Sequence, residues 1–312
     1  MNQPPASVVD PRIEDTYAEA FGMKYTRLIV TAVNDYWLEA ASAAFCGYGT
    51  SVIGCDAETG VERHLAETET PDGRPGLAIL AFGFSADALA QAVANRAGQC
   101  LMTCPTTAVF NGLDSDDIIP LGQHLRFFGD GFQKSKLLGH RRFWRIPVMD
   151  GEFVVEENLG VTSGIGGGNF ILQAADLETA LRSAEAAVAG IGALSGCITP
   201  FPGGVARSGS KVGSQYLNQV ASTAEAFCPT LRGRVPSKLH EQTAAALEIV
   251  IDAIDESSVR HAMQVGIRSA LSADPGGQLL RVAAGNYGGK LGKYLIPLHE
   301  VLADSSKKHT AD

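Results

Sequence analysis

Long apolar stretches are absent from this sequence. No run approaches the roughly 18 apolar residues that a membrane-spanning helix needs, so no membrane segment is predicted. The opening residues, MNQPPASVVDP, have neither a basic start nor an apolar centre, which argues against a secretory signal. The 6 cysteines are scattered through apolar surroundings, as is typical of reduced core thiols. We therefore predict a cytoplasmic protein.

Positive charge is also scarce. The chain has 25 Lys and Arg against 34 Asp and Glu, which gives a formal net charge of -9. Nucleic-acid binding depends on clustered Lys and Arg that contact phosphates, so this balance argues against a nucleic-acid partner. It remains compatible with a local basic pocket for an anionic small molecule.

The signatures of metal binding and of serine catalysis are missing. The sequence contains no CxxC pair, and after His240-Glu241 it has Ala244 where HExxH requires the second histidine. It contains no GxSxG motif, which carries the serine nucleophile of α/β-hydrolases. We therefore predict no metal site and no nucleophile of that kind.

Glycine is abundant, with 35 residues, but its loops lack nucleotide-binding patterns. After Gly164 and Gly166, a GxGxxG motif requires glycine where Asn169 stands, and the loop leads into a strand rather than a helix. The stretch AGNYGGK has Ala284 in place of the first P-loop glycine and Leu291 in place of the Ser or Thr after the lysine. Tight bends are the simpler interpretation, and a ligand-facing bend is the alternative.

Hydrophobic periodicity and turn residues predict the order strand, helix, strand, strand, helix, strand twice. In the first half we predict strands at 25–32, 50–54, 77–82 and 100–104 and helices at 34–47 and 85–98. In the second half we predict strands at 170–173, 197–199, 247–251, 279–283 and 294–297 and helices that begin at 176 and 255. Residues 160–168 are predicted as a glycine loop, and 125–155 and 208–240 as connecting segments.

The repeated order fits an α+β fold of two ferredoxin-like α/β sandwich lobes from an internal duplication. We predict an N-terminal lobe with its connector at 12–150, a C-terminal lobe at 151–302 and a polar tail at 303–312. In the helix after residue 176, one apolar face is predicted from the spacing of Leu177, Leu181, Ala184 and Val188.

One acidic residue interrupts an apolar strand. Alternation places Leu247, Ile249 and Ile251 on the face that packs against helices and Glu248 on the opposite face. That opposite face is either open to solvent or part of a partly dry cleft. In a dry cleft, desolvation would raise the pKa of Glu248 and suit it to proton transfer.

The order and spacing of several motifs resemble those of formylmethanofuran:tetrahydromethanopterin formyltransferases over nearly the whole chain. They run from IEDTYAEAF at 13–21 to Leu298-His299 and include GYGTSV, ETPDGRPG, GQCLMT, FFGDGFQ, GGNF, PFPGG, SKVGS, EIVI and AGNYGGKLG. The resemblance implies reversible formyl transfer between N5 of tetrahydromethanopterin, or its dephospho form, and the amine of methanofuran or a similar furan carrier. It implies that both coenzymes are cosubstrates, that no metal or prosthetic group is bound, and that the protein is a homo-oligomer, typically a tetramer.

The resemblance also implies roles for individual residues. The family's active-site glutamate falls on EIVI, which is Glu248 here, and it would move protons between the two nitrogens. Backbone amides of the glycine turns at 166–169 or 202–204 are candidate donors to the tetrahedral oxyanion. The turn at 166–169 contains Gly167, Gly168 and Asn169.

Methanofuran-type carriers bear glutamyl carboxylates, so the resemblance makes Arg207, Lys211 and Lys290 candidate anion contacts. Ordinary solvated cations are the alternative. The sequence departs from the family pattern at Phe132, where a tyrosine is common, and a leader before Pro11 and a Lys-rich tail look like additions.

The mild acidity resembles the version found in methylotrophic bacteria, a subunit of a formyltransferase/hydrolase complex in formaldehyde oxidation. There a metal-bearing partner subunit would hydrolyse the formyl carrier to formate. The competing interpretation is a non-catalytic subunit that binds the coenzyme or holds partner subunits together.

Overall fold

The computed structural model describes residues 10–303. Its first lobe contains β1 (Tyr17–Thr31), α1 (Asp35–Cys46), β2 (Glu58–Leu65), β3 (Gly76–Gly83), α2 (Ala86–Arg96) and β4 (Ala108–Asn111). These strands pair antiparallel in the order β4-β1-β3-β2. That order, with a helix after the first and third strands, is the ferredoxin-like arrangement.

The second lobe repeats this arrangement. It contains β10 (Thr162–Ala174), α4 (Leu177–Gly192), β11 (Cys197–Ile198), β14 (Ala245–Ala253), α5 (Glu256–Ser272) and β15 (Leu279–Ala283). Its strands pair antiparallel in the order β15-β10-β14-β11. The same sheet order therefore occurs twice, which confirms the predicted α+β fold of two ferredoxin-like lobes.

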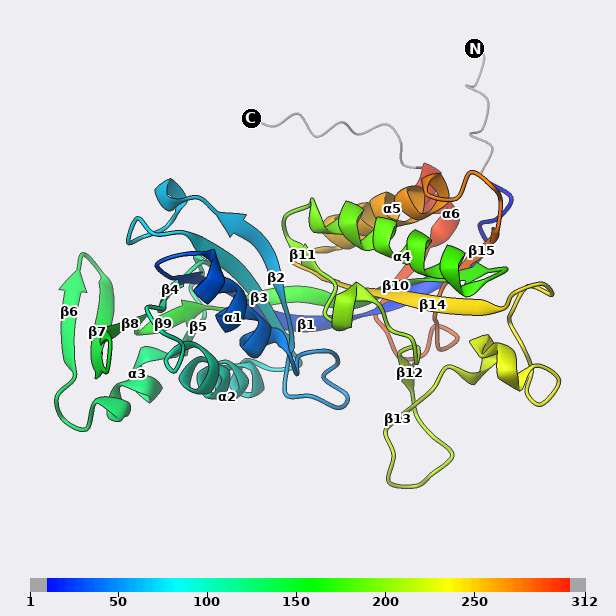
Figure 1. The fold of residues 1–312 in the computed structure, drawn as a ribbon. Coiled ribbons are helices and arrows are strands. Elements are labelled where there is room, and N and C mark those ends of the chain that lie inside the picture. The colour runs from blue at the N-terminus through cyan, green and yellow to red at the C-terminus, as the bar shows by residue number, and fades with distance from the viewer. Residues whose placement is uncertain (1–9, 304–312) are drawn as a thin grey trace, which may run out of the picture.

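One continuous sheet joins the two lobes (Figure 1). Residues 21–25 of β1 pair antiparallel with residues 162–166 of β10. The start of β1 pairs with β16 (Tyr294–Pro297), which leads into α6 (Leu298–Ala303). Each lobe keeps an apolar core of its own, and in the second lobe α4 and α5 cover one face of the sheet (Figure 1).

The predicted connector at 125–155 is largely strand. Between the lobes the chain forms β5 (Ile118–Pro120), α3 (Gly122–Leu125), β6 (Lys134–Leu138), β7 (Arg141–Val148), β8 (Gly151–Glu156) and β9 (Asn158–Gly160). Because β8 pairs in parallel with β4, the hairpins extend the first lobe's sheet in the order β6-β7-β8-β4. The polar stretch at 208–240 is mostly turns, as predicted, with β12 (Lys211–Val212) and β13 (Ala221–Ser222) paired inside it.

Two predicted strands are wrong. Residues 50–54 form turns, and the strand that follows α1 is β2. Residues 100–104 complete a π-helical segment, Ala97–Leu101, and a turn, so the strand begins later, at β4. Both predictions rested on short apolar runs, whose periodicity does not separate a strand from other buried backbone.

The predicted apolar face of α4 is partly wrong. Leu177 and Leu181 are exposed, whereas Ala184 is buried together with Ala180, Ala187 and Ile191. A side chain at Gly190 would have its Cβ 2.5 Å from Ser269 Oγ of α5, so the two helices lie very close together. This close approach requires small residues between the helices and leaves the leucines outside.

The glycine stretch at 160–168 lies in strands rather than in a loop. β9 ends at Gly160, and β10 contains the remaining glycines. The register between β10 and β14 shifts between Ile165 and Gly168, and Gly167 has a φ of 83°. The glycines therefore form a bulge, in which a left-handed residue is accommodated without steric cost.

The predicted leader before Pro11 lies outside the described residues apart from Asp10, and so does the predicted tail apart from Ala303. Among residues 10–303, no helix has both the length and the apolar character needed to cross a bilayer.

Candidate active site

Glu248 lies in the middle of β14 and is 4% exposed. Leu247, Ile249 and Ile251 belong to the core of the second lobe, as predicted. After β11 the chain continues along the edge of β14, where Ala206 N–H donates to the Glu248 carbonyl at 2.8 Å and the Ala206 carbonyl accepts the Glu248 N–H at 3.3 Å. The Glu248 side chain on the other face is buried and lines a cavity, so its environment is the partly dry cleft and not an open sheet face.

Ser210 holds the Glu248 carboxyl from two directions. Its backbone N–H donates to Oε2 at 2.6 Å, and its hydroxyl donates to Oε1 at 2.8 Å. Burial raises the pKa of Glu248 to about 7, and the two bonds from Ser210 oppose that rise. Glu248 therefore populates both its acid and its carboxylate form near neutral pH.

Ser210→Ala is expected to raise the pKa of Glu248 further, by about one unit, because the lost hydroxyl bond favours the carboxylate. Carbon NMR titration of labelled glutamate carboxyls would measure it, with Glu248→Gln identifying the resonance. The matched control is Ser208→Ala, since the Ser208 hydroxyl donates only to the nearby Gly209 carbonyl at 3.0 Å. An unchanged or lower pKa in Ser210→Ala would contradict the assignment.

The C-terminal glycine loop forms the other side of the site. Asn169 Oδ1 accepts a bond from Gly285 N–H at 2.6 Å, and Asn169 is itself buried. A Cβ on Gly285 would lie 3.2 Å from both Asn169 Oδ1 and Glu248 Oε1, so only glycine fits there comfortably. Tyr287 donates its hydroxyl to the Ser210 carbonyl at 2.6 Å, and burial followed by the charge of Glu248 raises its pKa. The glycine bend, for which a ligand-facing role was the alternative interpretation, thus lies beside the glutamate in the wall of a cavity.

A second buried carboxyl, which the sequence reasoning missed, organises this loop. Glu19 of β1 is fully buried and accepts backbone N–H bonds from Tyr287, Gly289, Leu291 and Gly292 at 2.6 to 2.9 Å. Burial alone would raise the pKa of Glu19, but the four donors outweigh it and lower the pKa. The signal in the sequence is a glutamate within the otherwise apolar stretch AEAF.

A cavity of about 190 Å³ opens beside Glu248 and includes Ser210, Tyr287 and Gly285 in its wall. Of the predicted anion contacts, Lys211 lines this cavity and is paired with Glu225 at 2.5 Å. Lys238 lines it as well. The other two, Arg207 and Lys290, are exposed and lie outside its wall.

Several of the predicted oxyanion donors already donate to other groups or face the core. Gly167 N–H already donates to Asp252 Oδ1 at 3.0 Å, and Gly204 N–H donates to the Phe201 carbonyl at 2.7 Å. Gly168 faces the core, since a Cβ there would lie 2.5 Å from Val259 Cγ1. Asn169 is the member of the predicted set that contacts the loop beside Glu248.

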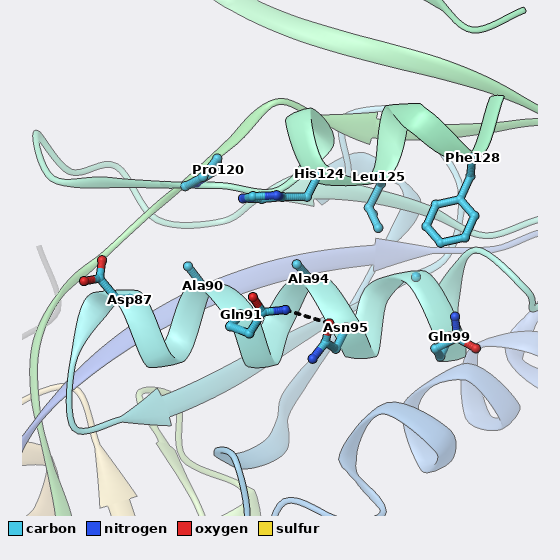
Figure 2. Close-up of a pocket in the computed structure, with 11 residues that line it drawn as sticks. Asp87, Ala90, Gln91, Ala94, Asn95, Gln99, Pro120, His124, Leu125 and Phe128 are labelled. Atoms are coloured by element: carbon cyan, nitrogen blue, oxygen red, sulfur yellow. Dashed lines mark hydrogen bonds between the residues drawn. The ribbon is translucent and has the colours of Figure 1, made fainter. Parts of the chain in front are cut away.

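A larger cavity of about 410 Å³ lies in the first lobe (Figure 2). Figure 2 shows Gln91 and Asn95 of α2 joined by a hydrogen bond, across from His124 and Phe128. None of the sequence-predicted site residues lines this cavity. Within residues 10–303, no group of three or more His, Cys, Asp or Glu side chains is arranged to hold a metal ion. The predicted site residues that line a cavity, Glu248 and Lys211, line the smaller one.

Comparison with known proteins identifies the family of the chain. The family model described as formylmethanofuran-tetrahydromethanopterin formyltransferase matches residues 7–148, and the model described as its proximal lobe matches residues 151–301. The protein named formylmethanofuran--tetrahydromethanopterin formyltransferase from Rhodopirellula baltica is 49% identical, with 96% of this chain and 94% of that protein covered. The protein of the same name from Methylococcus capsulatus is 48% identical, with 93% and 98% covered.

Solved structures show the same relationship. The formyltransferase from Methanosarcina barkeri superposes with a TM-score of 0.86 at 44% identity, covering 93% of this chain and 98% of that one. The formyltransferase/hydrolase complex from Methylorubrum extorquens, solved with methylofuran, contains a chain with a TM-score of 0.89 at 44% identity, covering 93% and 96%. The chain therefore belongs to the formylmethanofuran–tetrahydromethanopterin formyltransferase family.

Proposed function

We propose that this formyltransferase moves a formyl group reversibly between N5 of tetrahydromethanopterin, or its dephospho form, and the amine of a methanofuran-type carrier. One observation supports the placement of this reaction most strongly. The Glu248 carboxyl is buried beside a cavity, and its pKa is raised to about 7. A group that gains and loses a proton with equal ease at neutral pH suits a reaction that must run in both directions.

In the proposed mechanism the acceptor nitrogen attacks the formyl carbon, and a new C–N bond forms as the carbonyl oxygen becomes an oxyanion. The Glu248 carboxylate takes the proton that the attacking nitrogen must lose. When the oxyanion collapses, the C–N bond to the donor coenzyme breaks, and Glu248 returns the proton to the departing nitrogen. Ser210 keeps the carboxyl aimed at the cavity through both steps, because it binds both oxygens.

Charge in the cavity wall supports an anionic carrier. Lys211 and Lys238 line it, and we propose them as contacts for the carrier's glutamyl carboxylates, with Arg207 and Lys290 further out on the surface. Both coenzymes bind and leave as cosubstrates, and we propose no permanently bound cofactor.

We further propose a cytoplasmic homo-oligomer, a tetramer, that works in one-carbon metabolism through formaldehyde oxidation to formate. The support is a relative from Methylorubrum extorquens that is 44% identical to this chain and carries the name of a formyltransferase/hydrolase complex subunit. By this proposal the chain assembles with hydrolase subunits. We propose lobe boundaries at 12–150 and 151–302.

Formyl transfer from N5-formyl-tetrahydromethanopterin to a methanofuran-type amine, measured with the chain purified alone, tests the proposal. Turnover by the chain alone is the expected result. Turnover only after partner subunits are added would mean that the complex orders the site. Coenzyme binding without turnover in either case would support the non-catalytic subunit instead.

A further inference from the structure

Besides the pairing of β1 with β10, the two lobes make a second contact along β2, outside the wall of the cavity beside Glu248. Gly60 of β2 packs directly on β11, because a Cβ on Gly60 would lie 3.0 Å from the Ile198 side chain. Two residues further along, Glu62 Oε1 accepts the Gly196 N–H at 2.6 Å. Two residues before Gly60, Glu58 reaches Asp252 of β14, within hydrogen-bonding range. We call this contact, from Glu58 to Glu62, the lobe seam.

The two glutamates of the lobe seam are neutralised differently. Arg27 of β1 pairs with both oxygens of Glu62, at 2.6 and 2.7 Å. Among residues 10–303, no Lys or Arg forms an ion pair with Glu58 or Asp252. Both carboxyls are nevertheless buried, with Glu58 at 7% exposure and Asp252 at 0%. Two adjacent buried carboxylates without a cation cannot both stay charged at modest cost.

One carboxyl oxygen of the pair, Asp252 Oδ2, has no hydrogen-bond donor among the described atoms. Asp252 Oδ1 accepts the Gly167 N–H at 3.0 Å, and Glu58 Oε1 accepts the Val52 N–H at 2.9 Å. Asp252 Oδ2 itself is buried. One proton shared by the two carboxyls neutralises the pair, and a proton on Asp252 Oδ2 would give this oxygen a hydrogen bond to make.

This pair is connected to the active site through short contacts. Asp252 accepts the Gly167 N–H. The Gly167 carbonyl in turn accepts a hydrogen bond from Asn169 Nδ2 at 3.0 Å. Asn169 in turn binds the N–H of Gly285, and Gly285 packs against the Glu248 carboxyl. The glycine bulge of β10 is therefore fixed at one end by Asp252 and carries an active-site neighbour at the other.

Building on the function proposed above, we propose that Glu58 and Asp252 share one proton across the lobe seam and act as a positioning pair that holds the β10 bulge, and with it Asn169, against Glu248. Neither residue touches substrate. Loss of the shared proton leaves two like charges in a dry contact, which separates the lobes there and releases the bulge.

The other charged groups of the lobe seam are Glu62 and its partner Arg27. Tyr25 of β1 interacts electrostatically with that ion pair and with Asp255, which caps α5. Burial raises the pKa of both Glu58 and Asp252, and the charge of Glu58 raises that of Asp252 further. The stability that the protonated pair contributes is therefore present at low pH and is lost as pH rises through the folded-state pKa.

The thermal unfolding temperature, Tm, tests the shared proton without any assay of transfer. It should be measured against pH in a Glu248→Gln background, so that Glu248 itself no longer titrates. We expect Tm to fall as pH rises, and Asp252→Asn to remove that fall. The asparagine keeps an oxygen for Gly167 N–H and supplies an N–H to Glu58 at every pH. An infrared band of a protonated carboxyl should disappear in the same variant.

Glu62→Gln is the matched control, because it makes the same chemical change in the same seam but disrupts the Arg27 ion pair. It should lower Tm at all pH values and leave the fall of Tm with rising pH in place. A fall of Tm with rising pH in Asp252→Asn equal to that of the parent would overturn the shared proton.

Formyl transfer tests the positioning role with Glu248 intact. Asp252→Ala removes the acceptor of Gly167 N–H and should lower kcat roughly tenfold with a smaller change in KM, whereas Asp252→Asn should restore kcat at low pH. The fall in kcat with rising pH, about tenfold per pH unit once the pair ionises, should be absent from Asp252→Asn. Equal pH profiles of kcat in the two proteins would reduce the pair to a structural contact. If no variant and no parent protein transferred formyl groups, the proposed function would fail, while Tm and the infrared band would still decide on the proton.

Discussion

Glu248→Gln is expected to lower kcat for formyl transfer by about two to four orders of magnitude. The amide is nearly the same size and can still bond to Ser210, but it cannot take a proton from the attacking nitrogen. KM for both coenzymes should change little, because the cavity wall is intact. Steady-state kinetics in both directions would measure the effect.

The matched control is Glu241→Gln, which changes an exposed glutamate shortly before the same strand. It should leave kcat at the parent value. Near-normal turnover in Glu248→Gln would remove Glu248 from the mechanism and shift attention to Tyr287, which also lines the cavity.

The same substitution has a consequence for stability. The pKa of Glu248 is raised from 4.5 to about 7, so the folded state holds a proton that the unfolded chain has lost. The parent protein should therefore lose stability as pH rises from about 4.5 to 7, by roughly 3 kcal/mol, and then level off. Glu248→Gln should show a flatter stability curve over this window in denaturant titrations. Parallel curves for the two proteins would mean that the carboxyl is not desolvated.

Much of the fold could be predicted because its signals are local. The N-caps Asn34, Ser85, Asp176 and Asp255 each accept a bond from the first turn of the expected helix. The missed strand β2 carries Glu58 and Glu62, which look like surface residues in the sequence. Their partners lie in the other lobe, and no local pattern reveals them.

For the candidate site, the sequence predicted which side of β14 carries Glu248 but not whether that side is buried. Strand alternation correctly separated Glu248 from the core face of β14, because a period of two residues is a local property. What makes Glu248 unusual is its cover, which Ser210 and Tyr287 supply from two distant segments. Sequence spacing could not decide between an open face and a dry cleft, since that depends on how a long turn-rich segment folds back.

Glu19 provides the second large expected effect. Its two oxygens accept four backbone N–H bonds from the loop at 287–292, near the other end of the chain. Glu19→Gln replaces one of those oxygens with an NH₂ group that points at two N–H donors. We expect a loss of about 3 kcal/mol or more in the free energy of unfolding, because buried donors lose a charged acceptor.

The loop that Glu19 holds begins at Tyr287, which lines the cavity beside Glu248, so kcat should fall together with stability. Because the pKa of Glu19 is lowered in the folded state, its contribution to the free energy of unfolding decreases toward acid pH. This contribution is fully present above the unfolded-state pKa and is lost as pH falls through the folded-state pKa. Urea unfolding at several pH values would show a steeper acid loss in the parent than in Glu19→Gln. Glu178→Gln, at a side chain that is 91% exposed, is the control and should change neither stability nor kcat. If Glu19→Gln matched this control, the four bonds would contribute nothing beyond what water supplies, and the loop would have to be held by its other contacts.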